Sequence, residues 1–328
     1  MKDHYVTSFS DLGLAEALLN ALASAGYQTP SPIQAQTIPT LLQGRDVLGI
    51  AQTGTGKTAA FALPILNRIL ADRKRPAPGT VRALVLAPTR ELAAQIAESF
   101  RTYGQAMRPS LQIGLILGGV AHRPQVAMLS RGVDVLVATP GRLLDHMTTR
   151  RDALAATEVL VLDEADHMLD LGFIEPIRRI VALLPKTRQT VMFSATMPNE
   201  IGRLAADLLR DPVQVSIKAV AATAERVEQH VVFVDAPAKR DMLTSLMRDA
   251  AVTRAIVFTR TKREADRVAL HLDTAGIDAQ AIHGDKSQSQ RVRTLDAFRR
   301  GGTRLRAPHW PHGPRLRVRP IHLTICFG

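Results

Sequence analysis

Continuous runs of Val, Leu and Ile recur through the first part of the chain, and each is followed by a turn residue and a helical pattern of apolar positions. Such runs are typical of parallel strands buried on both faces, and their alternation with helices indicates repeated strand–helix units. We therefore predict one α/β domain over residues 1–212. Its strands are expected within 46–51, 82–88, 111–117, 133–139, 158–162 and 190–196.

A second series of strand–helix units follows the first. Residues 213–227 have no helical stripe and are interpreted as a linker. Residues 228–302 then repeat the alternation, which predicts a second α/β domain that begins in the same style. Its strands are expected within 230–236, 254–260 and 278–285, and its helices over about 238–250, 262–275 and 287–300.

The segment 303–328 departs from this pattern. A parallel sheet needs an apolar strand after the helix over 287–300, but residues 303–320 contain four Pro and no apolar run, so no strand is predicted there. We interpret 303–328 as an aberrant Arg- and Pro-rich tail and 228–302 as an incomplete domain. A Pro-rich disordered tail is one explanation.

A shifted reading frame is another explanation, which we favour. The codons for 310-WPHG-313, read one base over, permit Val-Ala-Ala-Arg. The Arg, Pro and His bias of the segment is also what a GC-rich gene yields out of frame. A genomic rearrangement or a sequencing error stays open as well.

Length and composition limit the class of protein. A chain of 328 residues fits two domains, and its single Cys excludes an internal disulfide framework and a thiolate metal cluster. No apolar run approaches the roughly 18 to 20 residues that span a bilayer, and the N-terminus lacks the apolar core of a signal peptide. We expect a cytoplasmic protein with no membrane partner.

The net charge of +12 is partly due to five Arg in 303–328, where there is no acidic residue. The remaining positive excess fits a polyanionic partner, although solvated basic faces explain it equally well. Aromatic residues make up only 4% of the chain, so composition does not indicate a platform for stacking bases. Any contact with nucleic acid is therefore expected mostly with its backbone.

A Gly-rich turn, 52-QTGTGKT-58, follows the strand at 46–51 and opens a helix. Gly54 and Gly56 let backbone N–H groups surround phosphate oxygens, Lys57 reaches the outer phosphates, and the Thr58 hydroxyl can hold Mg²⁺. The general pattern has Gly where this chain has Ala51. The position between strand and helix nevertheless predicts a nucleotide phosphate site formed by Gln52, Thr53, Gly54, Thr55, Gly56, Lys57 and Thr58.

An acidic cluster, 163-DEAD-166, directly follows the strand at 158–162. Carboxylates at the carboxyl end of a parallel strand lie at the edge where such sheets bind ligands. Asp163 can hold Mg²⁺ through its water shell, and Glu164 can orient and deprotonate an attacking water. An acid-rich helix start is the alternative explanation.

The stretch 26-GYQTPSPIQ-34 precedes the phosphate loop. The amide of Gln34 could pair with both the donor and the acceptor on the adenine edge. Tyr27, or Phe9 further upstream, could pack on the base. Taken alone, a Pro-bracketed turn before a helix is more readily explained by a structural role.

Together these segments resemble the DEAD-box ATP-dependent RNA helicases, most closely their bacterial RhlE-type branch. The resemblance covers residues from about 5 to 302, and Ala51 is this family's own form of the loop. It implies two RecA-like P-loop domains in tandem, the second incomplete. It rests on 26-GYQTPSPIQ-34, 51-AQTGTGKT-58, 88-PTREL-92, Gly118–Gly119, 139-TPGR-142, 163-DEAD-166 and 194-SAT-196, in this order.

The resemblance implies ATP and Mg²⁺ as cofactors and RNA as partner. Phe9 and Gln34 would hold adenine, Lys57 and the loop would hold phosphates, and Asp163 and Glu164 would serve metal and water. Ser194 and Thr196 would couple nucleotide state to RNA binding. The RNA backbone would be lined by Pro88, Thr89, Arg90, Gly118, Gly119, Thr139, Pro140, Gly141 and Arg142.

The second domain carries weaker matches. The segments 256-IVFTRTK-262, 283-HGD-285 and 290-QRVR-293 resemble family motifs, which implies RNA contacts by Phe258, Thr259, Gly284, Gln290 and Arg293. The family next places Asp-Val-Ala-Ala-Arg-Gly and then an Arg-rich motif that stabilises the transferring phosphoryl group. Neither is present in this chain.

Three hypotheses remain open from the sequence. The first is an RNA-dependent ATPase that unwinds short RNA duplexes and is impaired by its C-terminal segment. The second is a module that binds ATP and contacts RNA without turnover, and the third is a pseudogene product without a cellular function. Ribosome assembly and RNA degradation would both suit the family, and partners in either process are implied.

Overall fold

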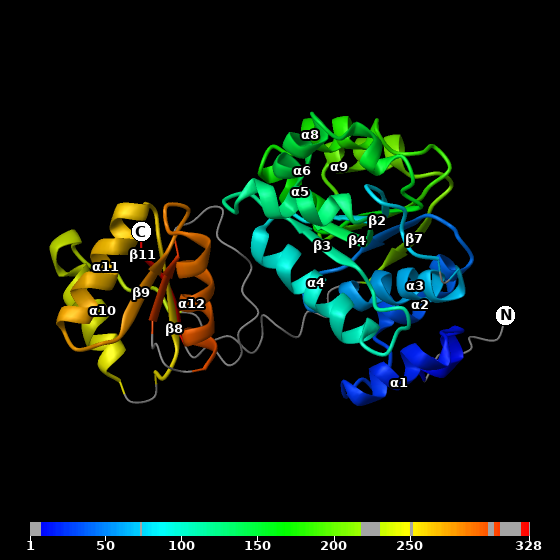
Figure 1. The fold of residues 1–328 in the computed structure, drawn as a ribbon. Coiled ribbons are helices and arrows are strands. Elements are labelled where there is room, and N and C mark those ends of the chain that lie inside the picture. Colours follow the sequence, from blue (N-terminus) through cyan, green and yellow to red (C-terminus); the bar gives the residue numbers. More distant parts are fainter. Residues whose placement is uncertain are drawn as a thin grey trace. The chain divides into compact units, whose positions relative to one another are not determined.

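The structure is a computed structural model that describes residues 8–72, 74–217, 230–249, 252–300, 305–308 and 323–327. The chain divides into two compact units at residue 220 (Figure 1). Each unit is an α/β structure around a parallel sheet, as the sequence pattern predicted. Among the described residues, none of the helices combines the length and the apolar character needed to cross a membrane.

The first unit contains a seven-stranded sheet in the order β3-β4-β2-β5-β6-β1-β7. Every neighbouring pair of strands in it is parallel. The strands are β1 (Val47–Ile50), β2 (Val81–Leu86), β3 (Ile113–Ile116), β4 (Val133–Ala138), β5 (Val159–Leu162), β6 (Gln189–Ser194) and β7 (Val213–Ser216).

Helices cover both faces of this sheet, and alternate strand residues separate into two cores. In β5, Val159 and Val161 pack with α1 to α4, whereas Leu160 and Leu162 pack with α6, α8 and α9. Figure 1 shows these two helix groups on opposite sides of the sheet. The helices are α1 (Glu16–Ser24), α2 (Pro32–Leu42), α3 (Lys57–Asp72), α4 (Arg90–Gly104), α5 (His122–Ser130), α6 (Pro140–Met147), α7 (Ala165–Asp170), α8 (Ile174–Val181) and α9 (Asn199–Leu208).

The predicted start of the linker, at residue 213, is wrong. Val213–Ser216 forms β7, an edge strand paired in parallel with β1, so these residues belong to the sheet of the first unit. Val215 is the one buried residue of this strand, which is why the segment shows no apolar run. Residues 218–227 of the predicted linker lie outside the described residues.

The second unit contains a four-stranded parallel sheet in the order β11-β8-β10-β9. Buried residues of β8, α10 and α11 form its main core. Its strands are β8 (Ala255–Thr259), β9 (Ala279–Ile282), β10 (Leu305–Pro308) and β11 (Leu323–Phe327), and its helices are α10 (Lys239–Arg248), α11 (Lys262–Thr274) and α12 (Gln288–Arg299).

The structure corrects the prediction that no strand lies between residues 303 and 320. Leu305–Pro308 forms β10 between β8 and β9, and Leu323–Phe327 forms β11 on the other side of β8. Backbone pairing with neighbouring strands can override weak strand propensity. Pro308 ends β10, where its missing N–H disturbs the ladder least.

The prediction of a strand within residues 230–236 is also wrong. Residues 230–235 have no regular structure, and a short 3₁₀ helix follows at Ala236–Ala238. The side chains of Val231, Val232 and Phe233 are exposed. An apolar run alone does not form a strand when no neighbouring strand pairs with it.

Gly132 sets the entry into β4 and provides a test of this fold. Its φ is +84°, and a Cβ there would lie 2.5 Å from the carbonyl oxygen of Ala77. We expect Gly132→Ala to lower the free energy of unfolding by about 2 kcal/mol, because left-handed backbone alone costs non-glycine residues roughly 1–2 kcal/mol. Urea denaturation of the full chain measures the difference.

The control is Gly202→Ala in α9, where an added Cβ would meet nothing within 4 Å. Alanine is favoured over glycine in helices by about 1 kcal/mol, so this variant should be neutral or more stable. Equal destabilisation by both changes would contradict the described geometry at Gly132.

Candidate functional site

The predicted motifs of the first unit share one edge of its sheet. Except for 26-GYQTPSPIQ-34 and Phe9, which precede β1, each follows the carboxyl end of a strand, and all seven strands run in the same direction. The sheet order then separates them into two halves. Segments after β1, β6 and β5 carry the predicted nucleotide residues, and segments after β2, β4 and β3 carry the predicted RNA residues. The two halves meet where β2 pairs with β5.

The phosphate loop connects β1 to α3. Gly54 and Gly56 have φ values of +91° and +96°, conformations that favour glycine. A Cβ at Gly56 would collide with the amide of Gln34 and lie 2.9 Å from Ser31 Oγ. Both glycines are therefore required by the turn, and they leave backbone exposed at the start of α3.

Lys57 is the first residue of α3 and is almost completely buried. Its Nζ donates a hydrogen bond of 3.0 Å to the Ala51 carbonyl and lies 4.0 Å from Asp163 Oδ1. Asp163 is equally buried at the end of β5. A buried ammonium needs such partners, because an isolated one would be strongly destabilising.

The donor set at this edge fits Mg²⁺. Thr58 presents a hydroxyl one residue after Lys57, and Asp163 presents a carboxylate. Mg²⁺ prefers oxygen ligands and commonly binds through one or two carboxylates, waters and substrate phosphates. Thr58 and Asp163 would thus hold the ion together with a nucleotide bound at the loop.

Glu164 adopts a left-handed backbone conformation, with φ and ψ both 55°. Non-glycine residues rarely do so, and such strain is often found at functional sites. The carboxylate is buried, and its Oε2 lies 3.4 Å from His167 Nδ1. Glu164 thereby differs in backbone conformation from Asp163, whose φ is not positive, although the two are neighbours in sequence.

A hydrogen-bond network joins the acidic cluster to 194-SAT-196. Asp166 Oδ2 accepts bonds from the Thr196 backbone N–H at 3.1 Å and from the Thr196 hydroxyl at 3.0 Å. The Ser194 hydroxyl accepts from the Asp166 N–H and donates to the Thr196 carbonyl. Sequence reasoning gave Asp166 no separate role, because no spacing rule predicts a bond across 30 residues.

Gln34 lies at the phosphate loop, but both ends of its side-chain amide make hydrogen bonds within the protein. Gln34 Oε1 accepts from the Ser31 N–H at 2.9 Å, and Nε2 donates to the Gly56 carbonyl at 3.1 Å. Tyr27 instead packs edge to face against Tyr103, with ring centroids 5.9 Å apart. Phe9 is buried in the apolar core. Adenine contacts by these three residues stay predictions.

The predicted RNA residues after β2, β3 and β4 lie together. Arg90 packs against Gly118 and Gly119 so closely that a Cβ at Gly119 would collide with its guanidinium. Arg142 Nη2 donates a 2.8 Å hydrogen bond to the Val120 carbonyl. The Thr89 hydroxyl accepts a hydrogen bond from the Leu92 N–H at the start of α4. The remaining predicted residues lie at the starts of α4 and α6: Pro88, Thr139, Pro140 and Gly141.

The matching residues of the second unit lie at the end of β8 and after β9, the two strands on either side of β10. Thr259 is buried at the end of β8, and Phe258 packs partly against the cluster of Ile256 and Phe298. A Cβ at Gly284 would lie 3.8 Å from Lys262 Nζ. Gln290 caps α12 by accepting from the Ser287 N–H, and the exposed Arg293 donates to the Ser289 carbonyl.

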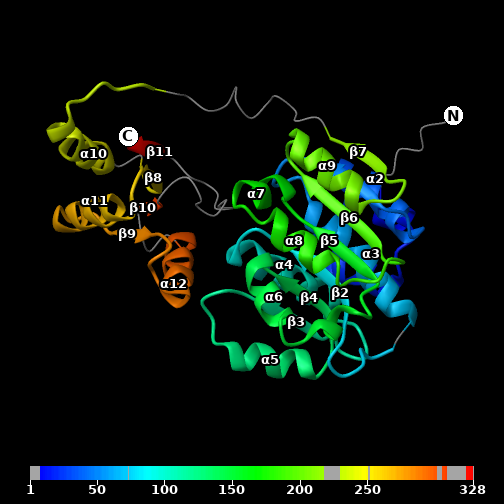
Figure 2. The same cartoon turned by 90° about the horizontal axis from the view of Figure 1, so that it is seen from above.

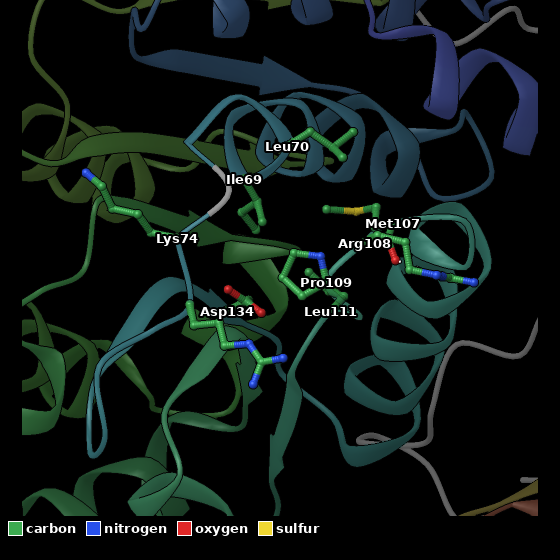
Figure 3. Close-up of a pocket in the computed structure, with 9 residues that line it drawn as sticks. Ile69, Leu70, Lys74, Met107, Arg108, Pro109, Leu111 and Asp134 are labelled. Carbon is green, nitrogen blue, oxygen red and sulfur yellow. Dashed lines mark hydrogen bonds between the residues drawn. The ribbon is translucent and has the colours of Figure 1, made fainter.

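A small cavity of about 20 Å³ lies away from this edge (Figure 3). Asp134, at the amino end of β4, is one of the residues around it. Burial raises the pKa of Asp134, while a hydrogen bond from the Gln112 N–H and the charge of Arg82 oppose this. The cavity is at the wrong end of the strands to take part in the site.

His146 in α6 is the most unusual buried group beside the RNA half. Its ring is fully buried, and neither ring nitrogen hydrogen-bonds to any residue that the structure describes. It stacks on the ring of His122, with centroids 4.0 Å apart and planes at 7°. Burial, followed by the charges of His122 and Arg142, lowers the pKa of His146 to about 4.

This pKa predicts a pH-dependent stability. The folded-state pKa lies below the ordinary value of 6.5, so the unfolded chain takes up the proton first as pH falls. The contribution of neutral His146 to the free energy of unfolding is complete above pH 6.5 and is lost as the pH falls toward 4. The loss is up to about 3 kcal/mol, because each pKa unit corresponds to roughly 1.4 kcal/mol. We expect His146→Phe to show a flatter pH dependence of urea unfolding between pH 7 and 5. An unchanged slope would contradict the assignment.

Family models match both units of the chain. The DEAD/DEAH box helicase model matches residues 31–204, more than half of the chain, and the helicase conserved C-terminal domain matches residues 238–305. The ATP-dependent RNA helicase DeaD of Mycobacterium tuberculosis is 45% identical over 294 residues, which are 90% of this chain and 51% of the relative. CshA of Bacillus anthracis, a DEAD-box ATP-dependent RNA helicase, is 42% identical over 296 residues, 90% of this chain and 55% of the relative.

Solved structures agree with these matches. Saccharomyces cerevisiae Dbp5 bound to RNA and ADP BeF3 aligns with a TM-score of 0.76 and 32% identity, covering 92% of this chain and 76% of that one. A DEAD box protein from Methanococcus jannaschii aligns with a TM-score of 0.59 and 32% identity, covering 98% and 85%. The chain spans about half the length of the curated relatives it matches. The expected resemblance is confirmed at this level, and the chain belongs to the DEAD/DEAH box helicase family.

Proposed function

We propose that this chain binds ATP with Mg²⁺, contacts the RNA backbone, and couples RNA binding to ATP hydrolysis and local separation of RNA duplexes. The observation that carries the proposal is the buried pair of Lys57 and Asp163 at the phosphate loop. It lies in the nucleotide half of the sheet edge, directly beside the RNA half. Assignment to the RhlE-type branch rests on the motif residues alone and stays a prediction.

The residues of the nucleotide half have separate tasks in this proposal. Backbone N–H groups from Gly54 to Thr58 and the Lys57 ammonium bind the phosphates. Bound Mg²⁺, held by Thr58 and Asp163, would neutralise charge on the outer phosphates. Glu164 orients the attacking water and accepts its proton.

The network around Asp166 links the acidic cluster to 194-SAT-196, the segment that we expect to couple nucleotide state to RNA binding. Asp166 follows Glu164 closely in sequence, and it holds both the backbone and the hydroxyl of Thr196. A change in the bound nucleotide that moves the acidic cluster would therefore also move 194-SAT-196. RNA recognition on the other half uses Arg90, Arg142 and glycine-exposed backbone, groups that bind phosphate oxygens without reading bases.

We further propose that hydrolysis by these 328 residues alone is weak. The family match in the second unit ends at residue 305, and residues 303–328 contain neither of the two motifs that the family places there. A missing Arg finger costs about 10³ to 10⁵ in rate. This favours a second candidate function, a module that binds ATP and RNA without turnover.

The cellular setting is also part of the proposal. We place the chain in the cytoplasm, with RNA as its partner through contacts independent of base sequence. Proteins of ribosome assembly or RNA degradation are the partners that the family suggests.

The phosphate-loop assignment is tested with Lys57→Ala. We expect loss of ATP binding, because Lys57 is the cation at the head of α3. Binding of a fluorescent ATP analogue to the full chain measures the affinity, and circular dichroism verifies folding. The control is Lys74→Ala, since Lys74 is an exposed lysine in the same unit. Unchanged affinity for the ATP analogue in a folded Lys57→Ala protein would contradict the assignment of the phosphate loop.

Turnover is tested by phosphate release with and without single-stranded RNA. The chain is compared with a version in which the reading frame is restored after Gly302, and Glu164→Gln in each provides the blank. We expect RNA-stimulated release about 10³-fold or more faster in the restored version, the size of an Arg-finger effect. Comparable release from both would refute the proposed impairment, and release by Glu164→Gln would refute the role of Glu164.

A further inference from the structure

His122 and His146 form a stacked pair beside the proposed RNA half that no motif of the chain accounts for. His122 is the first residue of α5, two residues after Val120, and its side chain is exposed. His146 lies beneath it in α6 and is fully buried. The rings are 4.0 Å apart and nearly parallel. Figure 2 shows α5 along the β3 side of the first unit.

The lower ring is unusual for a buried polar group. Both ring nitrogens of His146 lack a hydrogen-bond partner among the described residues. Buried polar atoms without partners destabilise a fold, and an apolar side chain would fill the same space without that cost. What His146 does provide is a flat surface under His122.

Burial, more than the surrounding charges, keeps this surface neutral at physiological pH. The charges of His122 and Arg142 also oppose a positive charge on His146, while Asp145 favours one less strongly than these two oppose it. The pKa of His146 is lowered to about 4. The lower ring therefore does not repel the upper one, and His122 is held flat while one of its faces is covered.

The pair lies next to groups that suit RNA phosphates. Arg142 is one helical turn from His146 in α6, so the two share a face of that helix. Its guanidinium bonds to the Val120 carbonyl, at the end of the Gly118–Gly119 loop. A strand whose phosphates lie along this loop and Arg142 would carry its bases within reach of His122.

We infer that His122 is a stacking residue for a nucleobase of single-stranded RNA, with His146 as the ring that positions it. The inference rests on the proposed RNA binding and adds a base contact to it. Histidine is one of the side chains on which unstacked RNA bases pack, and stacking of this kind tolerates any base sequence. The low content of Phe, Trp and Tyr gives no hint of it, since histidine is not counted there.

The test uses the full chain and two labelled probes, a decamer of adenosine and a decamer of the same backbone without bases. Fluorescence anisotropy gives the Kd of each. We expect His122→Ala to weaken binding of the adenosine decamer by about 5- to 100-fold, the range of one lost base stack. Binding of the abasic decamer should change less than twofold. His122→Phe should restore adenosine binding, because it keeps the ring and removes the nitrogens.

Two further variants separate stacking from a structural effect. Ser130→Ala changes an exposed residue at the other end of α5 and should bind both probes like the unmodified chain. His146→Phe keeps a flat ring under His122 and should retain adenosine binding, whereas His146→Ala should lose part of it. Thermal unfolding of each variant shows whether the first unit is intact.

The outcomes separate this inference from the proposed function. If the unmodified chain binds neither probe, the proposed RNA binding itself fails, and the inference fails with it. If the chain binds both probes and His122→Ala binds adenosine equally well, RNA binding stands and the stacking role is refuted. If His122→Lys restores binding but His122→Phe does not, His122 contacts phosphate, which also overturns the inference.

Discussion

The parallel backbone pairing of β5 with β6, and of β6 with β1, is the constraint on which the proposed nucleotide site depends. Strand pairing fixes the positions of the segments that leave the strands, because hydrogen bonds along each ladder prevent the strands from sliding. Lys57 after β1 and Asp163 after β5 are consequently held 4.0 Å apart, although 106 positions separate their residue numbers. The same sheet order places the segments after β2, β4 and β3 on the adjoining half of the edge.

Buried charge occurs at both ends of this sheet, but its partners differ. At the amino end, Arg82 is bonded to Glu158, Asp72 and the Lys74 carbonyl, so its donors are satisfied within the fold. Such a group stabilises the structure and needs no ligand. At the carboxyl end, Lys57 and Asp163 are buried next to glycine-exposed backbone, where a charged ligand can enter their environment. His146 represents a third case, in which polar atoms are buried without a hydrogen bond to the described residues.

The second unit shows how strongly neighbouring strands decide secondary structure. Its sheet incorporates Leu305–Pro308 and Leu323–Phe327, although the first lies in a segment rich in Pro and Arg. By contrast, the more apolar run at residues 231–233 is irregular and exposed. A strand is stabilised by the hydrogen bonds and contacts that its neighbours provide, so local composition predicts it poorly.

The sequence by itself determined the α/β class, six of the seven strands of the first unit and the glycine turn before Lys57, because these depend on local periodicity and on backbone conformations that only glycine adopts readily. It also identified Lys57, Asp163 and Glu164 as a group, since each follows the carboxyl end of a predicted strand. Only the tertiary structure decided which strands are neighbours, and hence that Asp166 bonds to Thr196 and that Gln34 bonds to Gly56. The stacking of His122 on His146 likewise depends on how α5 and α6 pack, because contacts between residues far apart in the chain are set by sheet order and helix packing rather than by spacing.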